Sequence, residues 1–176
     1  MDFSEACGAI LAEVSGSLAA VSDDQIAALC NVIAGARAVF VTGAGRSGLV
    51  GRCFAMRLMH LGLTAHFVGE TVTPRLRRGD VLVATSGTGE TAGTCAMARL
   101  AAEAGGRVVA LTAAERSTLG STAELVVLVP AGRSRQYGGS LFEQSALIAL
   151  EAVAFMLQQQ LGATAESMDA RHANLE

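Results

Sequence analysis

The chain has 176 residues, which is the length of one ordinary domain and enough to bury a sizeable core. Apolar residues make up 51% of it and charged residues only 16%. This surplus exceeds what one small domain buries, so we expect some apolar surface to meet another subunit. The net charge of −3 gives no reason to expect nucleic acid or an anionic membrane as a partner.

The cysteines and the first segment both indicate a protein that stays in a reducing compartment. No Cys-x-x-Cys pair occurs, so we expect neither a metal site nor a disulfide framework. Residues 1–20 carry three acidic residues and no basic one, unlike a secretory signal. Charge or glycine interrupts each apolar run before the roughly 20 residues of a membrane span. We therefore expect a soluble, cytoplasmic protein. The thiols are Cys7, Cys30, Cys53 and Cys95.

The spacing of apolar residues predicts an alternation of strands and helices behind a helical start. Residues 3–20 and 23–34 have helical spacing and predict an N-terminal helical hairpin. Helical spacing returns after the first strand, after the third strand and at the end of the chain. The expected strands are 38–42, 65–68, 80–85, 107–112 and 125–129. The expected helices are 49–61, an Ala-rich segment ending at Ala104, a short segment before the fifth strand, and 141–161.

The strands lack the polar alternation of a half-exposed sheet, so they should be buried on both faces. That pattern is typical of a parallel sheet flanked by helices. We therefore predict an α/β fold: a five-stranded parallel sheet in a three-layer α/β/α, flavodoxin-like arrangement. Residues 1–176 are expected to form one domain. Its parts would be N-terminal helices over 1–34, a sheet core over 38–130, a long helix over 141–161 and a tail over 162–176.

Two strand-to-helix loops have the composition of an anion site. In an open parallel sheet ligands bind beyond the carboxyl ends of the strands, where residues 43–48 and 86–91 fall. Glycines allow close backbone approach, and the helix N-termini that follow favour negative charge. Either loop alone is equally well explained as a tight turn, but two hydroxyl-bearing loops at one edge favour a phosphate monoester. The candidate phosphate ligands are Gly45, Arg46, Ser47, Ser86, Gly87, Thr88 and Thr91.

A dinucleotide site is the alternative for the first loop. Residues 43–48 match the fingerprint G-x-G-x-x-G between a strand and a helix, and an acidic residue, Glu70, follows the next strand. However, Glu70 lies beyond the usual spacing of about 20 residues. The chain has no room for a separate substrate domain, and a dinucleotide leaves the second loop unexplained. A sugar phosphate is therefore favoured, with Glu70 as a candidate for contacts to sugar hydroxyls.

The paired loops resemble the phosphate-binding signature of sugar-isomerase (SIS) domains. These are Thr42-Gly43-Ala44-Gly45-Arg46-Ser47-Gly48 and Thr85-Ser86-Gly87-Thr88-Gly89-Glu90-Thr91. Within this group, four further segments are similar to the 6-phospho-3-hexuloisomerases, so that the resemblance covers essentially the whole chain. They are Cys53-Phe54-Ala55-Met56-Arg57-Leu58-Met59-His60-Leu61-Gly62, Val68-Gly69-Glu70-Thr71, Leu141-Phe142-Glu143 and Arg171-His172-Ala173-Asn174-Leu175-Glu176.

The resemblance implies an isomerase that interconverts D-arabino-3-hexulose 6-phosphate and D-fructose 6-phosphate. This step follows formaldehyde fixation in the ribulose monophosphate pathway. The family is metal-independent and commonly tetrameric, so neither a cofactor nor a metal is expected. One departure is the loop 135–139, where the resemblance leads us to expect a proline. A non-catalytic sugar-phosphate-binding regulatory domain, or an isomerase of another sugar phosphate, stays the alternative; no basic helix-turn-helix accompanies the domain.

Moving a carbonyl from C3 to C2 requires a base at carbon and an acid/base at oxygen, acting through an enediol. Glu143 is our candidate for the carbon base, because it opens the final helix above an apolar stripe. A charge that complements the helix dipole explains it as well. Glu151, the lone charge within the apolar part of that helix, is the alternate candidate, although a buried interface salt bridge is its better explanation.

His172 is our candidate for the oxygen proton or for opening of the sugar ring. It lies four residues from the C-terminus, and we expect the tail to reach the site of a neighbouring subunit. His60 and His66 are weaker candidates and are expected to be packed or capping residues. The charge run of Arg75, Arg77 and Arg78 is expected to be a solvated loop.

Overall fold

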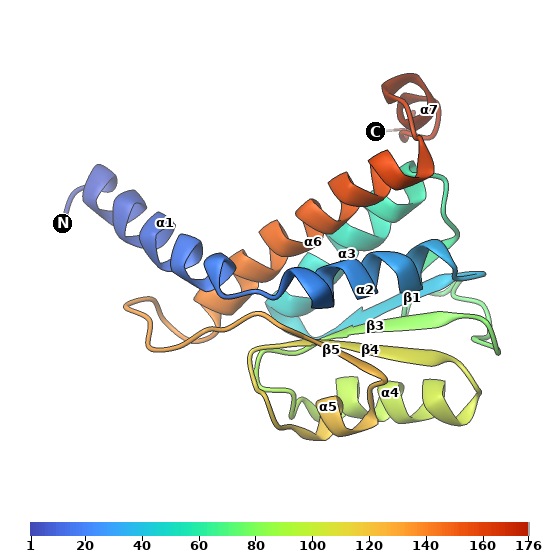
Figure 1. Ribbon diagram of the computed structural model, residues 1–176, viewed down its shortest axis with the longest axis horizontal. Helices are drawn as coiled ribbons and strands as arrows, with labels where there is room; N and C mark the ends of the chain where they lie inside the picture. The colour runs from blue at the N-terminus through green and yellow to red at the C-terminus, as the bar shows by residue number, and fades with distance from the viewer. Residues whose placement is uncertain (176) are drawn as a thin grey trace.

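The computed structural model describes residues 1–175 and shows five parallel strands between two layers of helices (Figure 1). The strand order is β2-β1-β3-β4-β5, which is the flavodoxin-like order predicted above. The strands are β1 (Val39–Gly43), β2 (Ala65–Phe67), β3 (Val81–Thr85), β4 (Arg107–Thr112) and β5 (Leu125–Leu128). The helices are α1 (Phe3–Ala19), α2 (Asp23–Ala34), α3 (Gly45–His60), α4 (Ala92–Glu103), α5 (Thr118–Thr122), α6 (Ser140–Leu161) and α7 (Ala165–Asp169).

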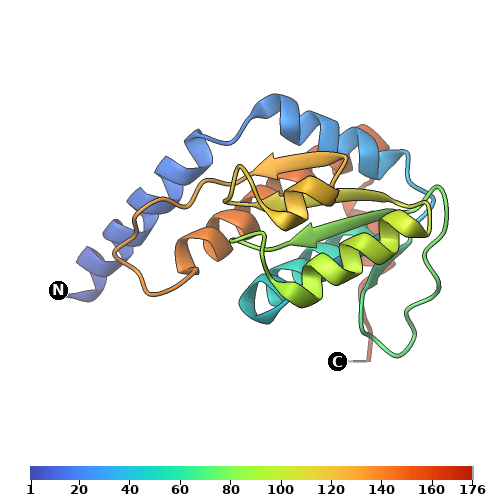
Figure 2. The same cartoon turned by 90° about the horizontal axis from the view of Figure 1, so that it is seen from below.

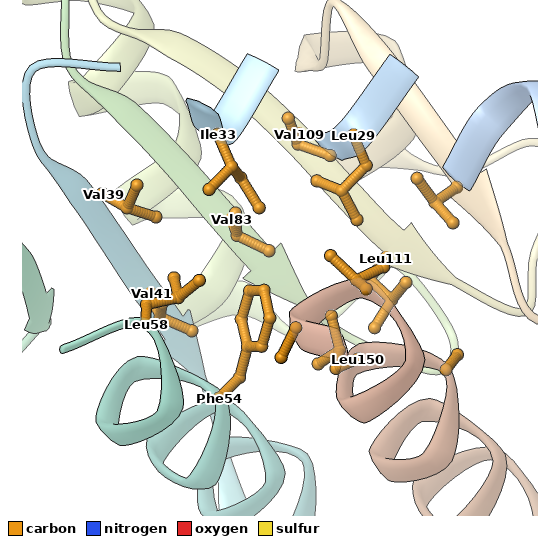
Figure 3. Packing of buried hydrophobic residues seen from close by; sticks show 14 of the residues in the cluster. Leu29, Ile33, Val39, Val41, Phe54, Leu58, Val83, Val109, Leu111 and Leu150 are labelled. Atoms are coloured by element: carbon orange, nitrogen blue, oxygen red, sulfur yellow. The ribbon is translucent and has the colours of Figure 1, made fainter. Parts of the chain in front are cut away.

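The strands divide their side chains between two cores because successive residues point to opposite faces. Val39 and Val41 belong to the larger core beneath α2, α3 and α6, which also contains Phe54 and Leu150 (Figure 3). Phe40 belongs to the smaller core beneath α4 and α5. The buried, non-alternating strands that indicated a parallel sheet are therefore explained by helices on both faces.

Helix boundaries follow local chemistry closely. Asp2 and Ser22 accept hydrogen bonds from the first turns of α1 and α2, as expected for N-caps, and Gly162 ends α6 in the left-handed conformation. The predicted N-terminal helical hairpin is confirmed, and the chain bends by 78° between its two helices. Helix α2 lies on the sheet, whereas α1 packs along α6 and extends beyond the sheet (Figure 1).

Two details of the prediction differ from the structure. The helix expected from Leu49 begins at Gly45, so the second half of the first glycine loop is the first turn of α3. The tail expected over 162–176 contains a short helix, α7, which a capping box at Thr164 starts. Glu176, the last residue of the tail motif, lies outside the described residues.

By length and composition helix α6 is apolar enough to cross a membrane, although Glu143 and Glu151 interrupt its apolar run as expected; α1 and α2 meet the same test as one bent pair. Half of the apolar window of α6 is buried inside the molecule. Its buried side chains pack against the sheet and α3, which accounts for that part of its composition. Its outward side chains include Ile148, Phe155 and Met156, which are exposed.

Candidate functional site

The two phosphate-loop candidates lie side by side at the carboxyl edge of the sheet. Gly43, the last residue of β1, pairs with Thr85, the last residue of β3, so the loops 43–48 and 86–91 leave neighbouring strands together. After β1 the chain crosses to β2 on one side of the sheet, whereas after β3 it crosses to β4 on the other side. This point of reversal is where open α/β sheets bind their ligands.

The first loop owes its shape to backbone contacts that exclude side chains. A Cβ on Gly48 would lie 2.5 Å from the carbonyl oxygen of Gly43, and a Cβ on Gly43 would lie 3.0 Å from the nitrogen of Gly48. Gly45 has φ +54°, the left-handed region that glycine adopts most readily. The hydroxyl of Ser47 and the guanidinium of Arg46 are consequently brought to the start of α3 at the sheet edge.

The second loop is held by hydrogen bonds among its own side chains. The buried Ser86 hydroxyl lies 2.9 Å from Thr91 Oγ1 and accepts from the Gly89 backbone N–H at 3.1 Å. Glu90 accepts from the backbone N–H and the hydroxyl of Thr118 at 2.7 and 2.6 Å. The hydroxyl of Thr118 is the main cause that lowers the pKa of Glu90, with its N–H second. The Glu90 carboxylate thus links this loop to α5 through hydrogen bonds.

The three helices whose N-termini meet at this edge of the sheet differ from the other helices in their capping. No side chain caps the N-terminus of α3, α4 or α6, whereas α1, α2, α5 and α7 each have a side-chain cap. Uncapped N-termini keep free N–H groups and the positive end of the helix dipole. An anion bound at this edge would satisfy these donors, as phosphates do at helix N-termini.

Helix α6 brings Glu143 to the first loop. The Glu143 side chain is 15% exposed and forms an ion pair with Arg46. Beside this pair, a hollow of about 260 Å³ lies between α3 and α6. Its lining residues are Arg46, Leu49, Val50, Cys53, Glu143, Gln144 and Leu147. A carboxylate and a guanidinium therefore meet at an apolar hollow beside the phosphate-loop candidates.

The second loop reaches the same helix through a glycine. A Cβ on Gly87 would lie 2.9 Å from the ring of Phe142, the residue before Glu143. Phe142 is buried in the larger core. The lack of a side chain at Gly87 therefore allows the first turn of α6 to pack directly against the second loop. Both loops thus contact the first turn of α6.

His172 does not join Glu143 within one chain. Its ring stacks on that of His60, with centroids 5.1 Å apart and planes 7° apart, at the far end of α3. Helix α3 has 16 residues, so its two ends are roughly 22 Å apart. Arg171 packs its guanidinium over Gly62 and donates to the His60 carbonyl. Arg171 and His172 are thus docked on their own subunit at the opposite edge of the sheet.

Glu70 also lies apart from the hollow. It follows β2 and forms an ion pair with Arg52, whose guanidinium lies 3.9 Å from the ring centroid of Phe67. Glu151, the alternate base, faces Arg57 at 3.4 Å, eight residues further along α6 than Glu143. The geometry groups Glu143 with Arg46 and leaves the other two carboxylates in surface ion pairs.

The remaining candidates have ordinary surroundings. His66 packs against Phe40, with ring centroids 5.1 Å apart. The arginines of the charge run are exposed, as expected of a solvated loop. The four thiols are free, and within residues 1–175 no group of three or more His, Cys, Asp or Glu is arranged to hold a metal ion.

Sequence reasoning missed Gln144, Glu90 and Phe142. Gln144 lines the hollow, and its carbonyl oxygen is buried with no hydrogen-bond partner among residues 1–175. Glu90 and Phe142 lie within the motifs that were singled out, but their tertiary partners are far along the chain. Only the adjacency of Gln144 and Phe142 to Glu143 pointed to them.

Comparison with known proteins places this chain in a family. Residues 32–157 match the model of the SIS domain. The 3-hexulose-6-phosphate isomerase of Mycobacterium gastri is 45% identical over 93% of this chain and 86% of its own length. That of Bacillus subtilis is 39% identical over the full length of both. A Methanococcus jannaschii protein, whose crystal structure inferred that same molecular function, has a TM-score of 0.89 at 31% identity and covers 98% of this chain and 99% of its own. The chain belongs to the SIS-domain family and, within it, groups with the 3-hexulose-6-phosphate isomerases.

Proposed function

We propose that this protein interconverts D-arabino-3-hexulose 6-phosphate and D-fructose 6-phosphate. The observation that carries the proposal is the Glu143–Arg46 pair, which lies beside two hydroxyl-bearing loops that lead into helices without side-chain caps. The chain is also similar over its full length to a 3-hexulose-6-phosphate isomerase. A phosphate site together with a carboxylate at its edge is what an aldose or ketose phosphate isomerase requires. The family relationship selects the 3-hexulose.

The substrate phosphate would bind across the two loops. Donors available there are the first-turn N–H groups of α3 and α4 and the hydroxyls of Ser47, Thr88 and Thr91. Arg46 carries a positive charge at the same edge, and on binding it would exchange part of its contact with Glu143 for the phosphate or a sugar oxygen. Both loops would then fix the far end of the sugar and direct its carbons toward Glu143.

The reaction moves a carbonyl without any net oxidation. Glu143, as the carboxylate, would remove the proton from C2 while the oxygen on C3 gains a proton, which gives a 2,3-enediol. Return of the proton from Glu143 to C3, with loss of the proton from the oxygen on C2, leaves the carbonyl at C2.

An acid/base for the oxygens would come from another subunit. His172 lies at the far end of its own α3, so we propose that a neighbouring subunit supplies its tail to the hollow. A homotetramer is the assembly we propose. The accessible surface of 9551 Å² exceeds the roughly 8000 Å² expected of a 17.9 kDa monomer, and Leu49 at the lip of the hollow is 61% exposed. Apolar surface beside a half-open site is suited to being covered by a second copy.

The metabolic role follows from the substrate. Arabino-3-hexulose 6-phosphate arises when formaldehyde is fixed in the ribulose monophosphate pathway, and we propose that the enzyme acts there, in the cytoplasm. Free thiols suit a reducing compartment.

The test is to supply enzymatically generated arabino-3-hexulose 6-phosphate to the purified protein and measure fructose 6-phosphate without added metal or nucleotide. Formation at a rate proportional to protein concentration is the expected result. Binding of fructose 6-phosphate without turnover would overturn the isomerase and favour a regulatory SIS domain.

A further inference from the structure

A glutamate on α1, outside the candidate site, organises the segment that leads into it. Residues 129–139 run from β5 to α6 without regular secondary structure and pass beside α1 (Figure 2). The Glu13 carboxylate accepts three hydrogen bonds from this segment. The donors are Ser134 Oγ at 2.6 Å, the Arg135 backbone N–H at 2.8 Å and Gln136 Nε2 at 3.0 Å.

A second contact from the same helix face holds the beginning of the segment. Ser17, one turn after Glu13, donates its hydroxyl to the carbonyl oxygen of Pro130 at 2.5 Å. Residues four apart lie on one side of a helix, so α1 presents both groups to the segment together. The segment is thus fixed to α1 near its start and again in its middle.

Gln136 carries the contact onward to the hollow. Its side-chain nitrogen donates to Glu13, while its side-chain oxygen accepts from Gln144 Nε2 at 2.9 Å. These two bonds fix the orientation of the Gln136 amide and, through it, that of Gln144. Gln144 lines the hollow next to Glu143. The path from Glu13 to the candidate site therefore passes through a single intervening side chain.

The contact between Glu13 and residues 134–136 persists near neutral pH. The Arg135 N–H is the main cause that lowers the pKa of Glu13 to about 2, and the Ser134 hydroxyl and Gln136 amide lower it further. A carboxyl with a lowered native pKa contributes its stabilisation above its unfolded pKa and loses it only as the pH falls through the native value. Glu13 is accordingly ionised, and its three donors engaged, near neutral pH.

We propose that Glu13 is a positioning residue of the isomerase. By holding residues 134–136 it fixes Gln144 and the first turn of α6, and so sets the place of Glu143 relative to the phosphate loops. The proposal rests on the proposed function, because positioning matters only if Glu143 acts on a substrate. Its chemistry is separate: Glu13 itself touches neither the hollow nor the loops.

The kinetic test is Glu13→Gln in the full chain, with Glu103→Gln on the exposed side of α4 as the matched control. We expect kcat to fall about tenfold while KM changes less than about twofold, because a misplaced catalytic group costs turnover more than binding. Gln136→Ala should act through the same path, so the double variant should be no worse than the more impaired single variant. An unchanged kcat in Glu13→Gln would overturn the proposal.

A structural readout independent of turnover accompanies the kinetics. The chain contains no tryptophan, and Tyr137 is 96% exposed, so Tyr137→Trp reports on this segment alone. Adding Glu13→Gln to it should lower the tryptophan anisotropy, with the oligomeric mass unchanged in light scattering. An unchanged anisotropy would show that Glu13 does not hold the segment. If the wild-type protein lacked isomerase activity, the proposed function would fail, while the anisotropy would still decide whether Glu13 holds the segment.

Discussion

The two loops at the carboxyl edge of the sheet reach the same position by different means. Residues 43–48 are shaped by backbone against backbone, since Gly43 and Gly48 approach so closely that Gly48 has no room for a side chain. Residues 86–91 are shaped by side chains, through the Ser86–Thr91 contact and the Glu90 bonds to α5. A loop closed by backbone contact tolerates no added side chain at its contact point. In a loop closed by several hydrogen bonds, the affinity for the ligand should instead fall gradually as single bonds are removed.

The largest effect is expected for Gly48→Ala in the first loop. The new Cβ would lie 2.5 Å from the carbonyl oxygen of Gly43. Gly43 ends β1 and Gly48 lies in the first turn of α3, so neither atom can move away easily. We expect the free energy of unfolding to fall by about 1–3 kcal/mol and the affinity for fructose 6-phosphate to be lost. Urea unfolding and calorimetric titration measure the two.

Gly8→Ala on α1 is the matched control, because a Cβ there meets nothing within 4 Å. It should stabilise the protein by roughly 0.5–1 kcal/mol through helix propensity. Equal stability and affinity in Gly48→Ala and the wild type would contradict the view that this loop is closed by backbone contact.

A smaller, graded effect is expected for Ser86→Ala in the second loop. The change removes the acceptor for the Gly89 N–H and the partner of Thr91, but leaves Glu90 attached to Thr118. We expect the affinity for fructose 6-phosphate to fall about 10- to 100-fold, because a buried donor left without its partner costs about 1–3 kcal/mol and the loop is no longer held in its binding shape. Titration of the phosphate ester measures it. A complete loss of binding would mean that the two loops respond alike.

The smallest effect is expected for Glu90→Gln, and it should depend on pH. The bonds from Thr118 lower the pKa of Glu90 in the folded protein, so its stabilisation is present above the ordinary glutamate pKa of about 4.3 and is lost as the pH falls through the lower native value. The Tm difference between wild type and Glu90→Gln should therefore shrink on acidification from pH 7 to pH 3. A Tm difference that stays constant over this range would show that the ionised form of Glu90 is not what ties the loop.

Much of the fold can be predicted from local pattern, because buried strands and helix boundaries depend on the types of residues that are neighbours in the sequence. The limits of β4 and α2 agree with the expected ranges. The start of α3 was misplaced because a glycine-rich turn and a glycine-rich first turn of helix look alike in sequence. Helix α7 depends on a capping box at Thr164 in a segment with little apolar spacing.

The site was predicted less completely than the fold because its geometry depends on contacts between distant residues. The position of Glu143 at the start of a helix was readable, but its pairing with Arg46 joins residues 97 apart. The stacking of His172 on His60, and the hold of Glu13 on residues 134–136, likewise exist only once α1, α3 and α6 are packed together. No periodicity in the sequence encodes such contacts.

The measurement that tests the account most directly is the turnover of arabino-3-hexulose 6-phosphate by Glu143→Gln and by Glu151→Gln. Both changes replace a carboxylate on α6 with its isosteric amide, but only Glu143 lies at the hollow. The account predicts that Glu143→Gln lowers kcat by about 10²- to 10⁴-fold with fructose 6-phosphate still bound, and that Glu151→Gln stays within about twofold of the wild type. Full activity in Glu143→Gln, or a comparable loss in Glu151→Gln alone, would contradict it.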